Sequence, residues 1–143
     1  MSTFPINLLS QVRMSLKLAK QLYTKRKNAL IISIERAQTL LGVLNVEVDR
    51  LEGAKKKLNS AWDAFDTAYD GLIAILIEDD TQAVEKEEKD EEQRYFDATV
   101  AGLDDDLEGT IAQRRRGQVI QRLQQERQAE NEQRQQEKQA EAE

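Results

Sequence analysis

Two runs of carboxylates are the first residues of this sequence that could do chemistry: Glu78-Asp79-Asp80 and Asp104-Asp105-Asp106. Hard cations prefer carboxylate ligands, and paired carboxylates serve as general acids and bases. Neither run has the spaced ligands, turn glycine and terminal glutamate of an EF-hand loop. Adjacent carboxylates on a helix should point to different sides, so we interpret both runs as solvated charge. We predict no catalytic residue, no metal site and no cofactor.

The sequence contains no histidine and no cysteine. This composition excludes thiolate nucleophiles, the usual zinc sites, disulfides and the Ser-His-Asp triad. No two glycines lie close enough for a phosphate-cradling loop, and we predict that the chain is not an enzyme. The run Arg114-Arg115-Arg116 could contact RNA phosphates or act as a nuclear import signal, but acidic residues soon follow it.

The 143 residues correspond to one domain at most, with a mean hydropathy of -0.70. No run of about 18 apolar residues is present, so we predict no membrane span. The first five residues, Met1 to Pro5, lack the basic and apolar regions of a signal peptide. We therefore expect an intracellular, cytoplasmic protein. The polar ending Glu141-Ala142-Glu143 suggests a piece of a longer protein.

The net charge of -6 hides a segregation along the chain. Residues 1–60 hold 11 basic and 4 acidic residues, whereas residues 61–110 hold 3 and 17. Such a division indicates either that the basic and acidic parts pack together or that like parts of different copies repel.

The strongest pattern is an apolar stripe with heptad spacing between Leu30 and Leu76, which we call the heptad stripe. Its positions alternate by four and three residues, as the a and d positions of a coiled coil do, and only Lys55 is polar. We therefore predict one long helix with a sticky side. The stripe consists of Leu30, Ile34, Ala37, Leu41, Leu44, Val48, Leu51, Leu58, Trp62, Phe65, Tyr69, Leu72 and Leu76.

A shorter helix is expected before this stripe, with Leu9, Val12, Leu16, Ala19 and Tyr23 on its apolar side. The heptad phase slips across residues 24–28. The chain either turns there or continues as a helix with a four-residue stutter. Continuity is favoured because no glycine or proline marks a turn.

A turn is predicted at Glu78 to Thr81, since Asp and Thr are good helix N-caps. A third helix should then run from about Thr81 to Leu107. Its packing residues are predicted to be Tyr95, Phe96, Val100 and Leu103, folded back in antiparallel fashion on the aromatic end of the heptad stripe. The alternative is one uninterrupted helix from residue 30 to residue 107.

Residues 111–143 carry ten glutamines, and no residue larger than alanine is apolar from Gln124 onward. We expect a frayed or isolated helix that acts as a linker. The predicted fold is therefore all-α: a long heptad-patterned helix with a shorter antiparallel helix, flanked by an N-terminal helix and a polar C-terminal helix. The predicted segments are residues 1–28, 29–108 and 109–143.

Two short motifs carry a resemblance to a known family: Ala61-Trp62-Asp63-Ala64-Phe65, and Asp90 to Asp97 with its Tyr95-Phe96 step. Together with Leu72 they resemble the upstream helical region of Gag-like polyproteins of Bel/Pao-type LTR retroelements. The resemblance covers roughly residues 30–108 and implies a role in promoting particle assembly. The capsid-like core and zinc knuckle of that family would need a later proline and cysteines, which this chain lacks.

Three functions follow as hypotheses. The first is a structural self-association module, a homo-oligomer held by the heptad stripe, in a state and strand direction that the sequence leaves open. The second is an adaptor that binds another protein through the same stripe. The third, less favoured, is an RNA binder; its basic residues would be Lys17, Lys20, Lys25, Arg26 and Lys27.

Overall fold

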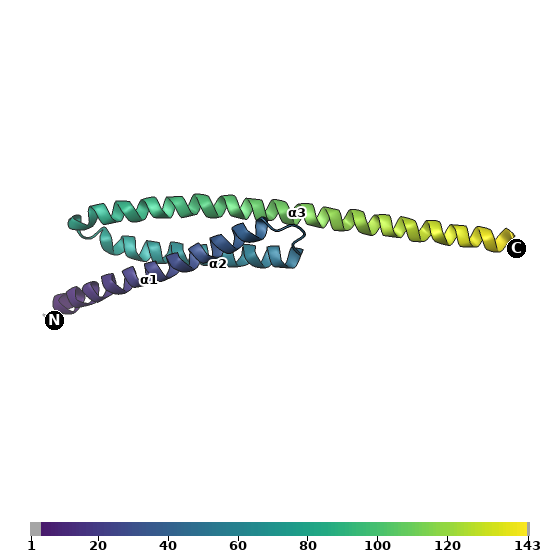
Figure 1. Ribbon diagram of the computed structural model, residues 1–143. Coiled ribbons are helices and arrows are strands. Elements are labelled where there is room, and N and C mark those ends of the chain that lie inside the picture. Colours follow the sequence, from purple (N-terminus) through teal and green to yellow (C-terminus); the bar gives the residue numbers. More distant parts are fainter. Residues whose placement is uncertain (1–3, 143) are drawn as a thin grey trace.

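The computed structural model describes the backbone of residues 4–142 and the side chains of residues 16–142 except that of residue 80. Leu9 and Val12 thus lie outside the described side chains. The described chain consists of helices α1 (Phe4–Leu41), α2 (Val48–Leu76) and α3 (Ala83–Ala142), with a short 3-10 helix η1 (Asp80–Gln82). The predicted all-α class is confirmed. Figure 1 shows the three helices side by side, with α3 much the longest.

The predicted single helix from Leu30 to Leu76 is wrong, because the chain leaves the helix between α1 and α2. Gly42, a poor helix former, ends α1, and Asn45 takes the left-handed conformation with φ of 63°. Asparagine tolerates that conformation better than other non-glycine residues. Leu44 therefore lies in the connection, 87% exposed, and its place in the heptad stripe is also wrong. Val46 from the same connection is buried in its stead.

The second reversal lies where the sequence predicts it. The side chain of Asp79 accepts hydrogen bonds from the backbone N–H of Thr81 at 3.0 Å and from the Thr81 hydroxyl at 2.7 Å. These bonds satisfy donors that the start of a helix leaves free. The turn makes α2 and α3 antiparallel neighbours, so the hairpin is present and the uninterrupted helix is not.

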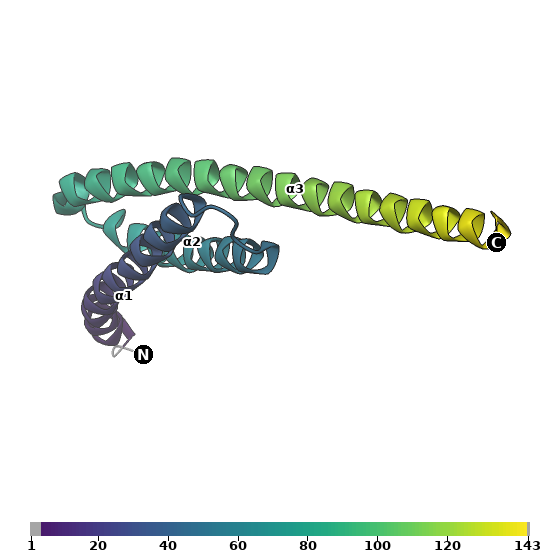
Figure 2. The ribbon, with the colours of Figure 1, turned by 45° about the vertical axis from the view of Figure 1, so that its right-hand side comes forward.

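α1 is continuous through residues 24–28, as favoured from the absence of a helix breaker. It runs across the predicted segment limit at residue 28. Because α1 and α2 are also antiparallel, the three helices run up, down and up. α1 crosses the other two obliquely (Figures 1 and 2).

The third helix does not end near Leu107 but continues to Ala142, so the expected short helix is the longest of the chain. Its last buried residue is Ile111, and the described residues from 115 onward are all exposed. Residues 116–142 form a projecting helix that extends roughly 40 Å beyond the bundle at 1.5 Å per residue (Figure 2). Helix-forming Gln, Glu, Arg and Ala residues keep it helical without packing.

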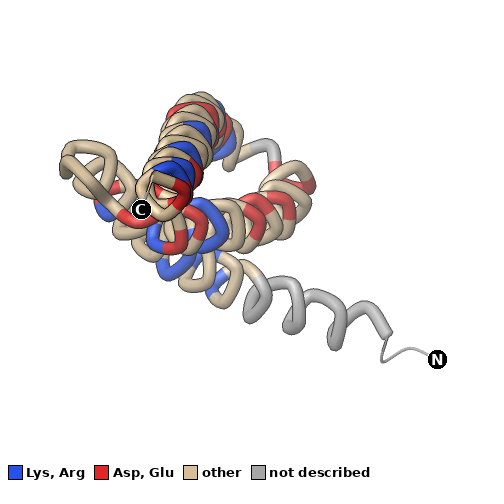
Figure 3. The backbone as a smooth tube through the Cα atoms, turned by 90° about the vertical axis from the view of Figure 1, so that its right-hand side faces the viewer, with Lys and Arg blue, Asp and Glu red and all other residues tan. Residues whose placement is uncertain are grey.

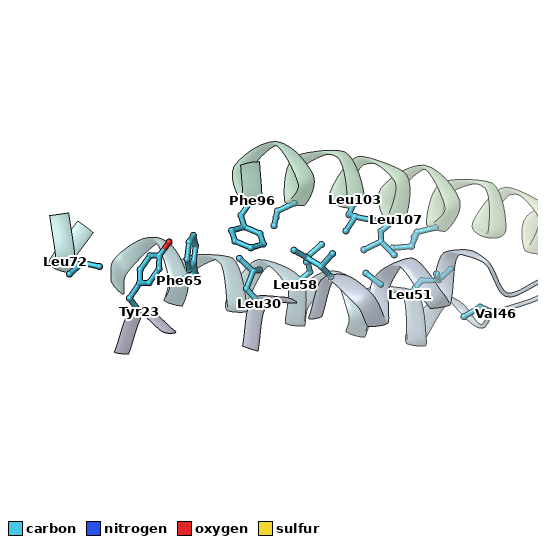
Figure 4. Packing of buried hydrophobic residues seen from close by; sticks show 14 of the residues in the cluster. Tyr23, Leu30, Val46, Leu51, Leu58, Phe65, Leu72, Phe96, Leu103 and Leu107 are labelled. Carbon is cyan, nitrogen blue, oxygen red and sulfur yellow. The ribbon is translucent and has the colours of Figure 1, made fainter. Parts of the chain in front are cut away.

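Buried side chains from all three helices form one core, which Figure 4 shows in close view. Phe65 of α2 lies at its centre, with ring centroids 5.2 Å from Tyr23 of α1 and 5.4 Å from Phe96 of α3. Phe96, Val100 and Leu103 are buried as predicted for the hairpin. Tyr95 is not: it is 66% exposed, because it stands one residue away from Phe96 on the helix and points outward. Its assignment to the packing patch is wrong.

Adjacent aromatic residues of α3 should therefore respond very differently to truncation. We expect Phe96→Ala to lower the free energy of unfolding by about 3–5 kcal/mol and to red-shift the emission of Trp62, the only tryptophan. Tyr95→Ala is the matched control and should cost less than about 1 kcal/mol as an exposed change. Chemical denaturation followed by tryptophan fluorescence measures both. Equal effects of the two variants would contradict the orientation of α3.

The projecting helix should contribute little to the stability of the bundle. Every described side chain among residues 124–143 is exposed, so deleting this segment should leave the melting temperature nearly unchanged. Thermal unfolding followed by circular dichroism tests this, with the helical signal before melting falling in proportion to the residues removed. A large drop in melting temperature would show that this segment packs on the bundle.

Candidate functional site

The heptad stripe, predicted as an association surface, packs inside one chain. Eight of its residues are buried: Leu30, Ile34, Ala37, Leu51, Leu58, Phe65, Leu72 and Leu76. Leu41, Val48, Trp62 and Tyr69 are partly buried against the same core. Because α1 and α2 turn their halves of the stripe toward each other and toward α3, a single chain covers the stripe, whereas the sequence left open whether a second copy or the third helix would do so.

The basic and acidic parts of the chain meet between α1 and α3, which confirms that they pack together. Lys20 pairs with Glu85 at 3.1 Å, and Lys27 pairs with Glu92 at 2.6 Å. The hydroxyl of Tyr23 donates to the same Glu92 carboxylate at 3.2 Å. The Lys and Arg positions and the Asp and Glu positions along the helices can be followed in Figure 3.

Glu92 is the carboxylate that α1 and α3 share. Its partial burial raises its pKa, but the hydrogen bond and the charge of Lys27 outweigh that effect, so the pKa lies below its ordinary value. Burial and the same carboxylate raise the pKa of the Tyr23 phenol. Both effects favour a charged Glu92 facing a neutral Tyr23 at neutral pH.

Acid should weaken the contact between α1 and α3. A carboxylate whose pKa is lowered on folding stabilises the fold above its unfolded pKa and loses that contribution as pH falls through the folded value. The free energy of unfolding of the wild type should decrease as the pH falls below 4.5, the ordinary pKa of a glutamate. Glu92→Gln should be less stable than the wild type at neutral pH but should lose less stability on acidification. Urea denaturation at several pH values measures this, with Glu126→Gln on the projecting helix as the control. Parallel pH profiles for wild type and Glu92→Gln would contradict the assignment.

A second polar layer joins α2 to α3. The Tyr69 hydroxyl donates to Asp90 at 2.5 Å, and Lys86 contacts the other oxygen of Asp90 at 2.8 Å. The hydrogen bonds from Lys86 and Tyr69 hold the pKa of Asp90 below its ordinary value. Burial, followed by the bond to Asp90, raises the pKa of Tyr69 to about 12. The hydrogen bond between Tyr69 and Asp90 joins α2 to α3.

Two residues of the acidic run at 104–106 and the nearby Glu108 form the one group of possible metal ligands among the described residues. Oxygens of Asp104, Asp105 and Glu108 lie within 4.8 Å of one another. The expectation that adjacent carboxylates diverge is therefore wrong for Asp104 and Asp105. A protein cation already stands at this group: the Lys55 ammonium lies 3.0 Å from Glu108 and 4.0 Å from Asp104.

Lys55, the polar residue that interrupts the heptad stripe, forms an ion pair with α3. Its hydrogen bond to Glu108 raises its pKa, and Asn59 donates to Asp104 at 2.9 Å beside it. The sequence showed only that Lys55 interrupts an apolar stripe. In the structure its ammonium pairs with Glu108 and Asp104 and thereby links α2 to α3. Of the arginine run, Arg115 pairs with Glu52 of α2 in the same region.

The side of α1 turned away from the core carries a feature that the sequence analysis missed. Exposed positions recur there with alternating four- and three-residue steps, and four of them are large and apolar: Leu18, Leu22, Ile32 and Val43. We call this set the α1 outer face; it consists of Leu18, Leu22, Lys25, Ala29, Ile32, Arg36 and Thr39 of α1 and of Val43, which lies just after the end of α1. Its heptad spacing was visible in the sequence, but the stronger heptad stripe masked it.

A groove of about 650 Å³ lies between the C-terminal half of this face and α2. The apolar residues that line the groove are Ile32, Leu40, Val43 and Ala54. Gly53 has no side chain to fill the groove from α2, and no atom lies within 4 Å of the position that a Cβ would take there. Three cations and one acid line it: Arg36, Arg50, Lys57 and Glu35. The groove is thus apolar inside and basic at its edges.

The outward side of α3 carries a second exposed row with the same spacing. We call this set the α3 outer face: Val84, Glu88, Glu91, Tyr95, Ala98, Gly102, Asp105 and Gly109. Val84 and Tyr95 are among the most exposed large apolar residues of the described chain, at 74% and 66%. This face is acidic where the α1 outer face is basic.

Comparisons with protein-family models, with curated proteins and with solved structures gave no match. The resemblance to Gag-like polyproteins therefore stays a prediction. None of the described helices combines the length and apolar character needed to cross a bilayer.

Proposed function

We propose that this chain is a structural module that self-associates, using the exposed faces of its bundle rather than the heptad stripe. The observation that carries the proposal is the α1 outer face. Four of its eight heptad-spaced positions hold large apolar residues, and these remain exposed although the chain has a core of its own. A row of this kind is typical of a helix that packs against another helix.

The resemblance of residues 30–108 to Gag-like polyproteins agrees with this role. In that case self-association would serve the assembly of a particle. The projecting helix would then act as a semi-rigid spacer between the bundle and whatever follows it.

Sedimentation equilibrium over a range of protein concentrations tests the proposal directly. We expect an average mass above the 16.4 kDa of one chain that rises with concentration. The variant lacking residues 124–143 should associate equally well, because both outer faces are formed by residues that precede this segment. A mass equal to one chain at every concentration would contradict self-association.

An adaptor role is the second candidate, and the projecting helix favours it. Val119, Ile120 and Leu123 lie exposed beyond the bundle and could form the apolar side of a contact with another protein. Under this alternative the wild type would remain monomeric, and a protein partner would bind it with loss of affinity on Leu123→Asp.

RNA binding has less support than the sequence analysis gave it. Two of the five cations considered for that role, Lys20 and Lys27, pair with glutamates of α3. Of the five cations, this leaves Lys17, Lys25 and Arg26 to contact phosphates. The acidic outer face of α3 would repel the phosphates of an RNA.

A further inference from the structure

The two outer faces complement each other in charge and in spacing. Among its eight positions the α1 outer face has the cations Lys25 and Arg36 and no acid. The α3 outer face has the acids Glu88, Glu91 and Asp105 and no cation. Each covers about three and a half heptads, a length at which heptad pairing becomes effective.

The two faces of one chain cannot meet each other. Each points away from the core that α1, α2 and α3 share, so neither face can cover the other within one chain. A contact between them therefore needs a second copy of the chain.

Pairing either face with itself is unfavourable. In an antiparallel two-fold arrangement of the α1 outer face, Lys25 would oppose Arg36 of the other copy. The corresponding arrangement of the α3 outer face would set Glu88 against Asp105. Like charges placed opposite each other disfavour both symmetric contacts.

On the proposed self-association we infer that the α1 outer face and its groove receive the α3 outer face of a second copy, with the two helices antiparallel. Stepping along both rows in opposite directions sets Val84 against Val43, Glu91 against Arg36, and Tyr95 against Ile32. Ala98 then opposes Ala29, where two small residues allow close approach. The acidic start of α3 thereby lies over the part of the groove edged by Arg50 and Lys57.

Such a contact joins two different surfaces, so one copy keeps its α3 outer face free and the other copy keeps its α1 outer face free. Repeating it produces a closed ring or an open filament rather than a two-fold dimer. The partner of the groove is therefore a second copy of this chain, arranged head to tail.

Charge reversal and charge exchange test the pairing. In sedimentation experiments, Arg36→Glu and Glu91→Arg should each weaken association by about tenfold or more, because each places like charges together. The double variant with both changes should associate like the wild type, since every contact regains an opposite pair. Arg122→Glu on the projecting helix is the matched control and should have no effect.

Mixing two blocked variants tests the head-to-tail arrangement. Ile32→Asp blocks only the α1 outer face, and Tyr95→Asp blocks only the α3 outer face. Each variant alone should be monomeric, and an equimolar mixture should form dimers and nothing larger. Both residues are exposed, so circular dichroism should show an unchanged fold.

The outcomes separate this inference from the proposed function. A wild type that associates while the four single variants associate equally well would overturn the pairing and leave self-association standing. A mixture of the blocked variants that stays monomeric would also overturn it. A wild type that is monomeric throughout would contradict both.

Discussion

Replacing Phe65 by alanine should destabilise the chain more than any other single truncation. Phe65 is fully buried, and its ring lies 5.2 Å from Tyr23, 5.8 Å from Trp62 and 5.4 Å from Phe96. Truncating a buried phenylalanine costs about 3–5 kcal/mol, and lost aromatic pairs add about 0.5–1.5 kcal/mol each. This is a large part of the roughly 5–15 kcal/mol that holds a typical domain folded.

Urea denaturation followed by circular dichroism measures the loss. Phe65→Leu is the conservative control; it loses the aromatic pairs but keeps an apolar group in the core, so it should cost clearly less than Phe65→Ala. Because Phe65 contacts both α1 and α3, its truncation should loosen both at once and lower the cooperativity of unfolding. A loss below about 1 kcal/mol for Phe65→Ala would mean that the three helices do not meet at this ring.

Introducing aspartate at Leu51 should unfold the bundle, whereas the same change at Leu44 should be tolerated. Leu51 has no exposed surface, and an unpaired carboxylate buried there would cost more than about 4 kcal/mol. Leu44 is 87% exposed in the connection between α1 and α2, so the expected cost is about 0.5 kcal/mol or less. The two positions are equivalent in the heptad stripe, and only the break after α1 distinguishes them.

The two variants can be compared by circular dichroism and thermal melting of the purified chains. Leu51→Asp should lose most of its helical signal at room temperature, apart from what the projecting helix retains. Leu44→Asp should melt close to the wild type. Equal damage by both variants would restore the single long helix that the spacing predicts.

The sequence by itself determined the all-α class, the reversal at Glu78 to Thr81 and the burial of Phe96, Val100 and Leu103. These depend on local properties: helix-forming composition, a capping aspartate and apolar residues spaced for one side of a helix. The segregation of basic and acidic residues was also visible in the sequence, but it left open whether the two parts pack together or like parts of different copies repel.

Only the tertiary structure decided that the heptad stripe is divided between two antiparallel helices. The seven-residue spacing from Ala37 through Leu44 to Leu51 continues across the connection, although the chain reverses there. The spacing of apolar residues indicates which residues face a core. Two antiparallel helices that face one core show the same spacing as one long helix that faces a partner. Gly42 and Asn45 were the local signal for the break, but a single glycine or asparagine in a sequence does not by itself predict where a helix ends.

The outer faces also show that the spacing of apolar residues does not distinguish buried positions from exposed ones. Leu18, Ile32, Val84 and Tyr95 are apolar residues whose exposure the sequence could not reveal, because a core position and a docking position use the same residue types. Packing decides between them: once Phe65, Leu30 and Leu107 have filled the space between the helices, any apolar row left over must face outward. The tertiary structure thereby moved the candidate association surface from the heptad stripe to the two oppositely charged outer faces of the bundle.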